Sequence, residues 1–172
     1  MSLINQLAQF YQFICEKLEA LGVWLPSLFL RLILAWEFGE AGFEKLHGSN
    51  WFANLTFPFP FNLLPPDISW GMATFFEIVG AFALAFGLVT RFFSISLLIL
   101  TIVAISAVHW PDSWNTLSEL LNGYRISDPE QDGFGNYKLP LIYIFMLIPL
   151  VLNGAGKLSL DYLLNQLIKK FA

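Results

Sequence analysis

Four apolar stretches constrain the fold of this 172-residue chain more than any other feature. They cover approximately residues 24–45, 68–90, 92–109 and 139–154. About 20 such residues cross the hydrocarbon layer of a bilayer as a helix, although the fourth stretch is short and contains Pro149. Hydrophobic residues make up 56% of the sequence and charged residues only 13%, about half the charged share of soluble proteins. The sequence therefore predicts an integral membrane protein with four spans.

The two ends of the chain show a different pattern. Large apolar residues recur at helical spacing over residues 3–21 and again over 158–171, and polar residues lie largely off each stripe. Helices of this kind lie on a membrane surface with their apolar face in the lipid. We therefore expect one all-α domain over residues 1–172, which is an integral membrane four-helix bundle with an amphipathic surface helix at each end.

The connections between the spans predict the orientation. Loop 48–66 is rich in aromatic residues and proline, whereas loop 111–138 is polar and acidic. One side of the membrane would hold five basic residues: Lys17, Arg91, Lys157, Lys169 and Lys170. The other side would hold three: Lys45, Arg125 and Lys138. Because basic residues gather on the cytoplasmic side, both termini are expected in the cytoplasm and both loops outside.

Charged side chains interrupt the first apolar stretch, "RLILAWEFGEAGFEKLHG" over residues 31–48. On a helix, Glu37, Glu40 and Glu44 fall within about 60° of one another. An acid at mid-bilayer costs about 2.5 kcal/mol or more, so this stripe is expected to face the bundle interior. Small residues in the same stretch would let a neighbouring helix approach closely: Gly39, Ala41 and Gly42.

Two further polar residues belong to the second and third spans, Glu77 and His109. The rise per residue places Glu40, Glu77 and His109 in the outer half of the membrane, where they could line one outward-facing pocket above Arg31. A neutral acid can donate a proton, and histidine changes charge near pH 7. We therefore take Glu40, Glu77 and His109 as catalytic candidates for proton movement coupled to quinone chemistry. The substrate-binding candidates are Arg31, Glu37, Glu44 and Trp110.

Structural roles remain open for most of these residues. Glu44, Lys45 and His47 lie near the interface, where water can solvate them, and Glu37 can be partly exposed in the interior of the bundle without a chemical role. Arg31 can clamp backbone carbonyls or pair with Glu77. His109 can belong to the belt of residues at the membrane–water interface.

The sequence gives little indication of a cofactor. His47, His109 and Met72 are weak candidate metal ligands, because the two histidines do not share a helix at i, i+4 spacing. The single cysteine, Cys15, cannot form an internal disulfide. The net charge of −4 without a basic run argues against nucleic acid as a partner. Quinone and copper remain the candidate ligands, alongside the lipid bilayer and a second copy of the chain as partners.

Several motifs together resemble the DoxX family of small four-helix membrane proteins. They are Arg31 followed by "GFEKL", then "FFEIVGAFALAFGLVTR", then His109, then "GAGKLSLD" at 154–161. The resemblance covers about residues 28–162, and Arg31, Glu40, Glu77 and His109 match the family pattern. It implies a bacterial inner-membrane protein with a redox or quinone-linked accessory role, such as a quinone-linked oxidoreductase subunit.

The "HWP" motif and the segment "NYKLPLIYIFMLIPLVLNGAGKLSLD" resemble one branch of that family. This branch occurs in gene clusters that mature copper-binding, ribosomally made peptides. The resemblance implies a metal-dependent peptide-modifying enzyme and its recognition protein as partners. A second class of function also fits, in which the protein is a non-catalytic membrane anchor or metal-handling partner. It would then dock proteins or peptides through its acidic and aromatic outer loops. Residues 57–61 are expected to pack on or into the outer leaflet over the bundle, and a partner-docking face is the competing interpretation.

Overall fold

The computed structural model describes residues 3–111, 115–121 and 137–171, so Arg125 and most of the acidic loop lie outside the described residues. Regular structure in the described part is entirely helical. The α-helices are α1 (Leu3–Gly22), α2 (Leu25–His47), α3 (Pro66–Phe86), α4 (Thr90–Ala104), α5 (Leu117–Leu121), α6 (Lys138–Asn153) and α7 (Leu160–Phe171). Short turns add the 3-10 helices η1 (Phe52–Asn54) and η2 (Phe61–Leu63) and one π-helical turn, η3 (Ile105–His109).

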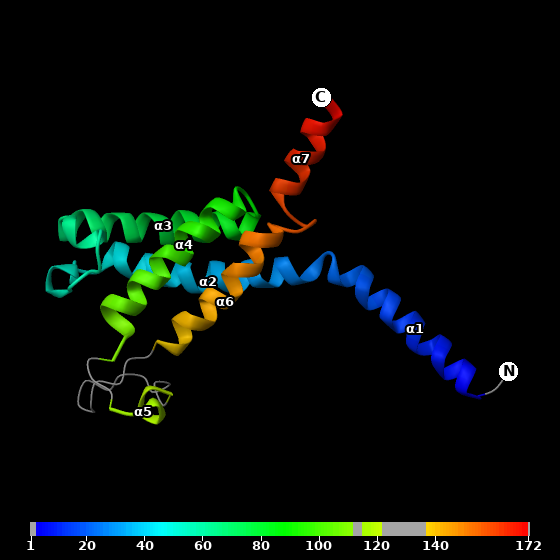
Figure 1. Ribbon diagram of the computed structural model, residues 1–172. Helices are drawn as coiled ribbons and strands as arrows, with labels where there is room; N and C mark the ends of the chain where they lie inside the picture. Colours follow the sequence, from blue (N-terminus) through cyan, green and yellow to red (C-terminus); the bar gives the residue numbers. More distant parts are fainter. Residues whose placement is uncertain (1–2, 112–114, 122–136, 172) are drawn as a thin grey trace.

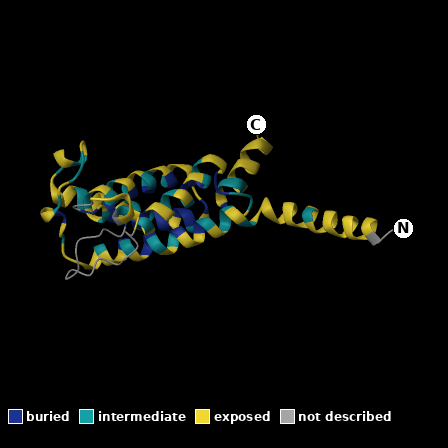
Figure 2. Cartoon of the chain, turned by 60° about the horizontal axis from the view of Figure 1, so that its bottom comes forward, coloured by how far each residue is buried: buried dark blue, intermediate teal, exposed yellow. Residues whose placement is uncertain are grey.

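Four of these helices share one hydrophobic core. Helix α2 packs on α3 and α6, and α4 packs on α3 and α6 (Figure 1). The core side chains are Leu34, Phe38, Ala81, Leu84, Leu97, Leu147 and Leu150. Much of the surface of these helices is exposed (Figure 2), and the exposed side chains include many large apolar ones, among them Phe29, Trp36, Phe75, Phe82, Phe86, Ile102 and Phe145. Such a surface suits lipid, which confirms the prediction of a membrane protein.

Helix length and composition support fewer clear spans than the predicted four. Among the described helices, α3 and the continuous α4–η3 segment are long and apolar enough to cross a membrane. Helices α1 and α2 would add a third span if taken together, but they meet at a bend of 45°. Helix α6 has 16 residues, about 24 Å at 1.5 Å per residue, which is shorter than the hydrocarbon layer. Four spans therefore remain a prediction.

The boundary between the second and third predicted spans lies earlier than expected. Helix α3 ends at Phe86 because Gly87 adopts a left-handed conformation with φ of 65° and donates its N–H to the carbonyls of Ala83 and Leu84. Helix α4 then begins at Thr90 rather than at residue 92. At its other end, α4 widens into the π-helical turn that ends at His109.

Arg31 joins three segments at the end of the molecule where α1 and α7 leave the core helices (Figure 1). Its buried guanidinium donates to the carbonyls of Leu84 (2.8 Å) and Ala85 (3.1 Å) in the last turn of α3. It also donates to the carbonyls of Ala155 (3.1 Å) and Leu158 (2.5 Å), which lie in the loop after α6. Of the alternatives open for Arg31, these contacts favour a clamp on carbonyls rather than an ion pair with Glu77.

The "GAGKLSLD" motif also holds the turn between α3 and α4. The Asp161 carboxylate accepts the N–H groups of Val89 (2.7 Å) and Thr90 (2.9 Å). A Cβ added at Gly87 would lie 2.5 Å from Ser159 Cβ and 2.6 Å from Arg31 Nη1. The turn can therefore come this close to the motif only with glycine at position 87. The turn between α3 and α4 is therefore in direct contact with the "GAGKLSLD" motif.

Helices α1 and α7 leave the core helices at the same end, and most of their residues are exposed. Helix α7 presents Leu163, Leu164, Leu167, Ile168 and Phe171 to the surroundings. Both segments are therefore helical with nearly the predicted bounds. Their position on a membrane surface remains a prediction.

Candidate ligand-binding site

A cavity of about 520 Å³ lies between α2, α3, α4 and α6, at the end opposite Arg31. The aromatic segment 51–64 contributes its roof. Most lining residues are apolar or aromatic, and the polar ones are Glu37, Lys45, Ser69, Glu77, Ser96, Thr101, His109 and Tyr143. Three lining side chains are exposed on the outside of α3, α4 and η3: Met72, Ile99 and Val108. The wall of the cavity that these three side chains form therefore lies at a surface that suits lipid.

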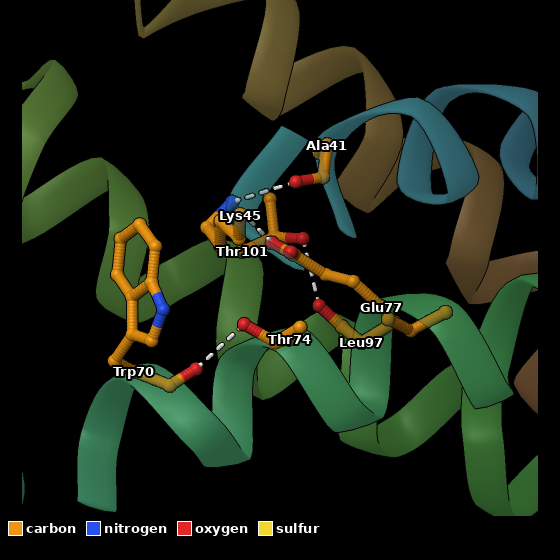
Figure 3. A network of polar contacts seen from close by, with 7 residues as sticks. All are labelled: Ala41, Lys45, Trp70, Thr74, Glu77, Leu97 and Thr101. Atoms are coloured by element: carbon orange, nitrogen blue, oxygen red, sulfur yellow. Dashed lines mark hydrogen bonds and ion pairs between the residues drawn. The ribbon is translucent and has the colours of Figure 1, made fainter. Parts of the chain in front are cut away.

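An ion pair between Lys45 and Glu77 forms the polar centre of this cavity (Figure 3). Lys45 Nζ lies 3.0 Å from Glu77 Oε1 and 3.4 Å from the carbonyl oxygen of Ala41. Glu77 is only 3% exposed. Its second oxygen, Oε2, is buried and has no hydrogen-bond partner within the described residues. A buried carboxylate oxygen without a donor is costly, so it is a natural contact for a ligand.

Two glycines of α2 bring that helix close enough for the ion pair to form. A Cβ on Gly42 would lie 2.7 Å from Ile78 Cγ1 and 3.0 Å from Glu77 Cβ. A Cβ on Gly39 would lie 3.5 Å from the Cβ of Ala81. The expected close approach of a neighbouring helix at these small residues is therefore confirmed, and α3 is that neighbour.

Two hydroxyl groups near the ion pair are committed elsewhere. Thr74 Oγ1 donates to the carbonyl of Trp70 at 2.9 Å, and Thr101 Oγ1 donates to that of Leu97 at 2.7 Å (Figure 3). The hydroxyl of Ser69 also lines the cavity and is buried without a partner in the described part. The cavity thus presents a cationic donor, a free carboxylate acceptor and a free hydroxyl.

A second polar pair lies on the α6 side of the cavity. The Tyr143 hydroxyl donates a hydrogen bond to Glu37 Oε2, and both residues line the cavity. The Tyr143 ring also packs against Phe38 with ring centroids 5.8 Å apart. His109 reaches the cavity from the π-helical turn η3, a distortion that is frequent at functional sites.

The aromatic roof is held by edge-on ring contacts. Phe52 is buried and its ring centroid lies 5.0 Å from those of Trp51 and Trp70. Phe57 packs on Phe52 at 5.1 Å and lines the cavity, as does Phe61. Phe59, by contrast, is 78% exposed. The segment 57–61 therefore covers the core helices with two of its phenylalanines and presents the third outward.

The structure brings together only some of the predicted site residues. Glu37, Glu77, His109 and Met72 line the cavity, whereas the others do not: Arg31, Glu40, Glu44, His47 and Trp110. The His47 ring lies at an exposed helix end, with Nδ1 2.9 Å from the carbonyl of Phe43. Trp110 packs on the ring of Tyr137, with centroids 5.2 Å apart.

The expectation that the whole acidic stripe faces the interior is wrong for Glu40 and Glu44, which are exposed. The buried face of α2 carries Arg31 and Phe38, and Glu40 lies about 200° around the helix from Phe38. Periodicity had placed the three acids side by side but had not identified the face that meets α3.

Sequence reasoning missed Lys45 and Tyr143 as site residues. Lys45 follows Phe38 by seven residues, so it shares the buried face of α2, and this spacing could have identified it. Tyr143 carries a hydroxyl within an otherwise apolar stretch of α6. No group of three or more His, Cys, Asp or Glu side chains suited to a metal ion occurs in residues 3–111, 115–121 and 137–171.

Comparison with known proteins identifies the family. Residues 27–110 match the DoxX family model. The chain is also 45% identical over 152 residues to a protein of Haemophilus influenzae described as an uncharacterized protein, and the match covers 87% of this chain and 90% of that one. No solved structure matches. The match to the family model includes nearly all of α2 and the whole of α3, α4 and η3, and this membrane protein belongs to the DoxX family.

Proposed function

We propose that this protein binds the head group of a lipid-borne quinone in the cavity around Lys45 and Glu77. The buried, unpartnered Glu77 Oε2 beside the Lys45 ammonium carries the proposal. A quinone carbonyl can accept a hydrogen bond from Lys45, and a quinol hydroxyl can donate one to Glu77. The apolar lining suits the ring, and the exposed side formed by Met72 and Ile99 gives access from the bilayer.

Proton handling belongs to residues that line the cavity. Reduction of a quinone to a quinol takes two electrons and two protons, and a partner protein would have to supply the electrons. Glu77 and His109 remain the candidate acid–base groups, and Glu37 replaces Glu40 because Glu37 lines the cavity with its Tyr143 partner. Glu40 and Glu44 then contribute negative charge outside the cavity.

The proposed setting is a bacterial inner membrane crossed by α2, α3, α4 and α6 as a four-helix bundle. The Arg31 end would face the cytoplasm, because Arg91, Lys157 and both termini lie there, with α1 and α7 on the membrane surface. The protein would act as an accessory component of an oxidoreductase system. The motifs shared with the copper-peptide branch suggest a peptide-modifying enzyme and its recognition protein as partners.

Quinone content of the purified protein tests this proposal. The protein is extracted in a mild detergent, and quinone is measured per mole of protein in the wild type, Glu77→Gln and Glu40→Gln. We expect near-stoichiometric quinone in the wild type and in Glu40→Gln, and at least a tenfold loss in Glu77→Gln. Equal quinone content in Glu77→Gln and the wild type, or none in the wild type after supplementation with ubiquinone, would overturn the proposal.

A second candidate function rests on the exposed side chains of the roof. Phe59 and Leu63 are 78% and 71% exposed, which suits a membrane anchor that docks a partner protein through this loop. Met72 and His109 both line the cavity, so copper handling is the metal-based form of this alternative. Isothermal titration with Cu(I) tests the metal-based form. Co-purification of partner proteins with the wild type and with Phe59→Ser/Leu63→Ser tests the docking loop, and these two measurements distinguish the alternative from quinone binding.

A further inference from the structure

A second cavity of about 620 Å³ lies at the opposite end of the core helices, beside the turn between α3 and α4. Its walls come from the start of α4, the loop after α6 and the first turns of α7. Its polar lining residues are Thr90, Arg91, Asn153, Lys157, Ser159, Asp161, Tyr162 and Asn165. None of these residues lines the cavity around Lys45 and Glu77.

Two cationic side chains of this cavity retain unused donors. Arg91 Nη2 donates to the carbonyl of Leu152 at 3.2 Å, the one hydrogen bond of its guanidinium among the described residues. A guanidinium has five N–H donors, so most of them stay available. The Lys157 ammonium lies 5.1 Å from the centroid of the Trp24 ring and makes no hydrogen bond within the described part of the chain.

A third donor is buried in the cavity wall. Thr90 is 0% exposed, and its Oγ1 has no hydrogen-bond partner in the residues that the structure describes. Unpartnered buried hydroxyls are uncommon because their desolvation is uncompensated. Together with the two cations, this hydroxyl indicates an oxygen-rich anionic ligand.

The Asp161 carboxylate also lines this cavity, and groups of the protein stabilise its negative charge. Its two carboxylate oxygens accept the N–H groups of Val89 and Thr90, and Arg31 interacts with it electrostatically. With Asp161 counted against Arg91 and Lys157, the cavity lining keeps an excess of one positive charge.

We propose that this cavity binds the phosphate group of an anionic phospholipid. Val23, Val89 and Phe92 line the same cavity and are half exposed or more. A cavity that combines basic groups with exposed apolar side chains suits an amphipathic ligand, with the acyl chains along Phe92 on the outside of α4. A lipid is thus favoured over free phosphate, which has no apolar part.

Native mass spectrometry of the detergent-solubilised full chain tests the proposal with phosphatidylglycerol as the probe. We expect one tightly retained lipid, and about a 25-fold weaker affinity in Arg91→Gln/Lys157→Gln, because each cation near anionic lipid contributes about fivefold. Lys169→Gln/Lys170→Gln removes the same charge from α7 outside the cavity and should retain the lipid. Equal losses in the two double variants would mean diffuse surface attraction and would overturn the proposal.

A variant without a charge change guards against a folding artefact. Thr90→Val keeps the shape of the side chain and removes only the unpartnered hydroxyl, so it should melt no lower than the wild type yet bind phosphatidylglycerol several-fold more weakly. Phosphatidylcholine and inorganic phosphate serve as the comparison ligands. Equal retention of phosphatidylcholine would show that the site does not select anionic lipid. Stabilisation by inorganic phosphate with no lipid retained would assign the site to a soluble anion.

Discussion

Replacing Lys45 by methionine should destabilise the protein more than replacing Glu77 by glutamine. The two charged atoms are 3.0 Å apart, which corresponds to about 5.5 kcal/mol of attraction at an effective dielectric constant of 20. Desolvation offsets part of this attraction. Lys45→Met removes the ion-pair partner of Glu77, which is 3% exposed, and an orphaned buried charge costs about 3–5 kcal/mol.

Glu77→Gln leaves the Lys45 ammonium without its ion-pair partner, but this charge can move toward water. The Lys45 side chain is 17% exposed and lies near the end of α2, so its long stem can carry the ammonium outward. Glu77→Gln is therefore expected to cost only about 1–2 kcal/mol. In the double variant neither charge is buried, and the coupling between the two sites should be about 2 kcal/mol.

Reversible unfolding in mixed micelles with increasing SDS, followed by tryptophan fluorescence, measures these free energies. Lys17→Met is the control, because Lys17 is exposed on α1 and its ammonium lies 5.2 Å from the centroid of the Phe13 ring. The effect of this change should stay within about 0.5 kcal/mol. The reasoning fails if Lys45→Met costs less than Glu77→Gln, or if the coupling energy is indistinguishable from zero.

Four further predictions follow from other contacts. Gly42→Ala should separate α2 from α3 and lower stability by about 1–3 kcal/mol in the same SDS titration. The control Gly71→Ala, with nothing within 4 Å of its added Cβ, should be neutral or stabilising. Similar losses of stability at both sites would contradict the packing argument. Gly87→Ala should cost about 2 kcal/mol or more, because it combines a φ of 65° with contacts to Ser159 and Arg31, and an unchanged melting temperature would exclude this. Tyr143→Phe should weaken quinone binding several-fold without loss of folding, measured by quinone content; unchanged content would remove the Tyr143–Glu37 pair from the site. In a Cys15→Ser background, an impermeant maleimide should label Leu63→Cys but not Lys170→Cys in intact cells, and the opposite labelling would reverse the topology.

The sequence was sufficient for the class of protein and for some of the cavity. Apolar stretches predicted membrane helices because lipid tolerates few charges, and Glu77 was expected to face the interior because it is the only charged residue in the stretch 68–90. The partner of Glu77 was not predicted. Lys45 lies near the end of α2 and was assigned to the interface, but Glu77 lies in the middle of α3, so the two helices are offset along their axes.

The angular position of the acids shows a second limit. Helical periodicity fixes the angle between Glu37 and Glu40 but not which of them turns toward α6 and which outward. Only the packing of the glycine face of α2 on α3 decides this, and that packing depends on Gly39 and Gly42 meeting particular residues of another helix. Tyr143 likewise comes from a helix far along the chain, so no local pattern places it beside Glu37.

The Arg31 clamp has a consequence for the biosynthesis of the protein. Two of its carbonyl acceptors, at Ala155 and Leu158, are translated 124 and 127 residues after it, which is roughly 6 to 25 s at 5–20 residues per second. During that interval the earlier carbonyls of Leu84 and Ala85 can solvate the guanidinium only in part. A ribosome that stops before residue 154 therefore releases a chain with every apolar stretch nearly complete and one buried charge half solvated. A product truncated before Ala155 and Leu158 would therefore keep a buried guanidinium that lacks two of its four carbonyl acceptors.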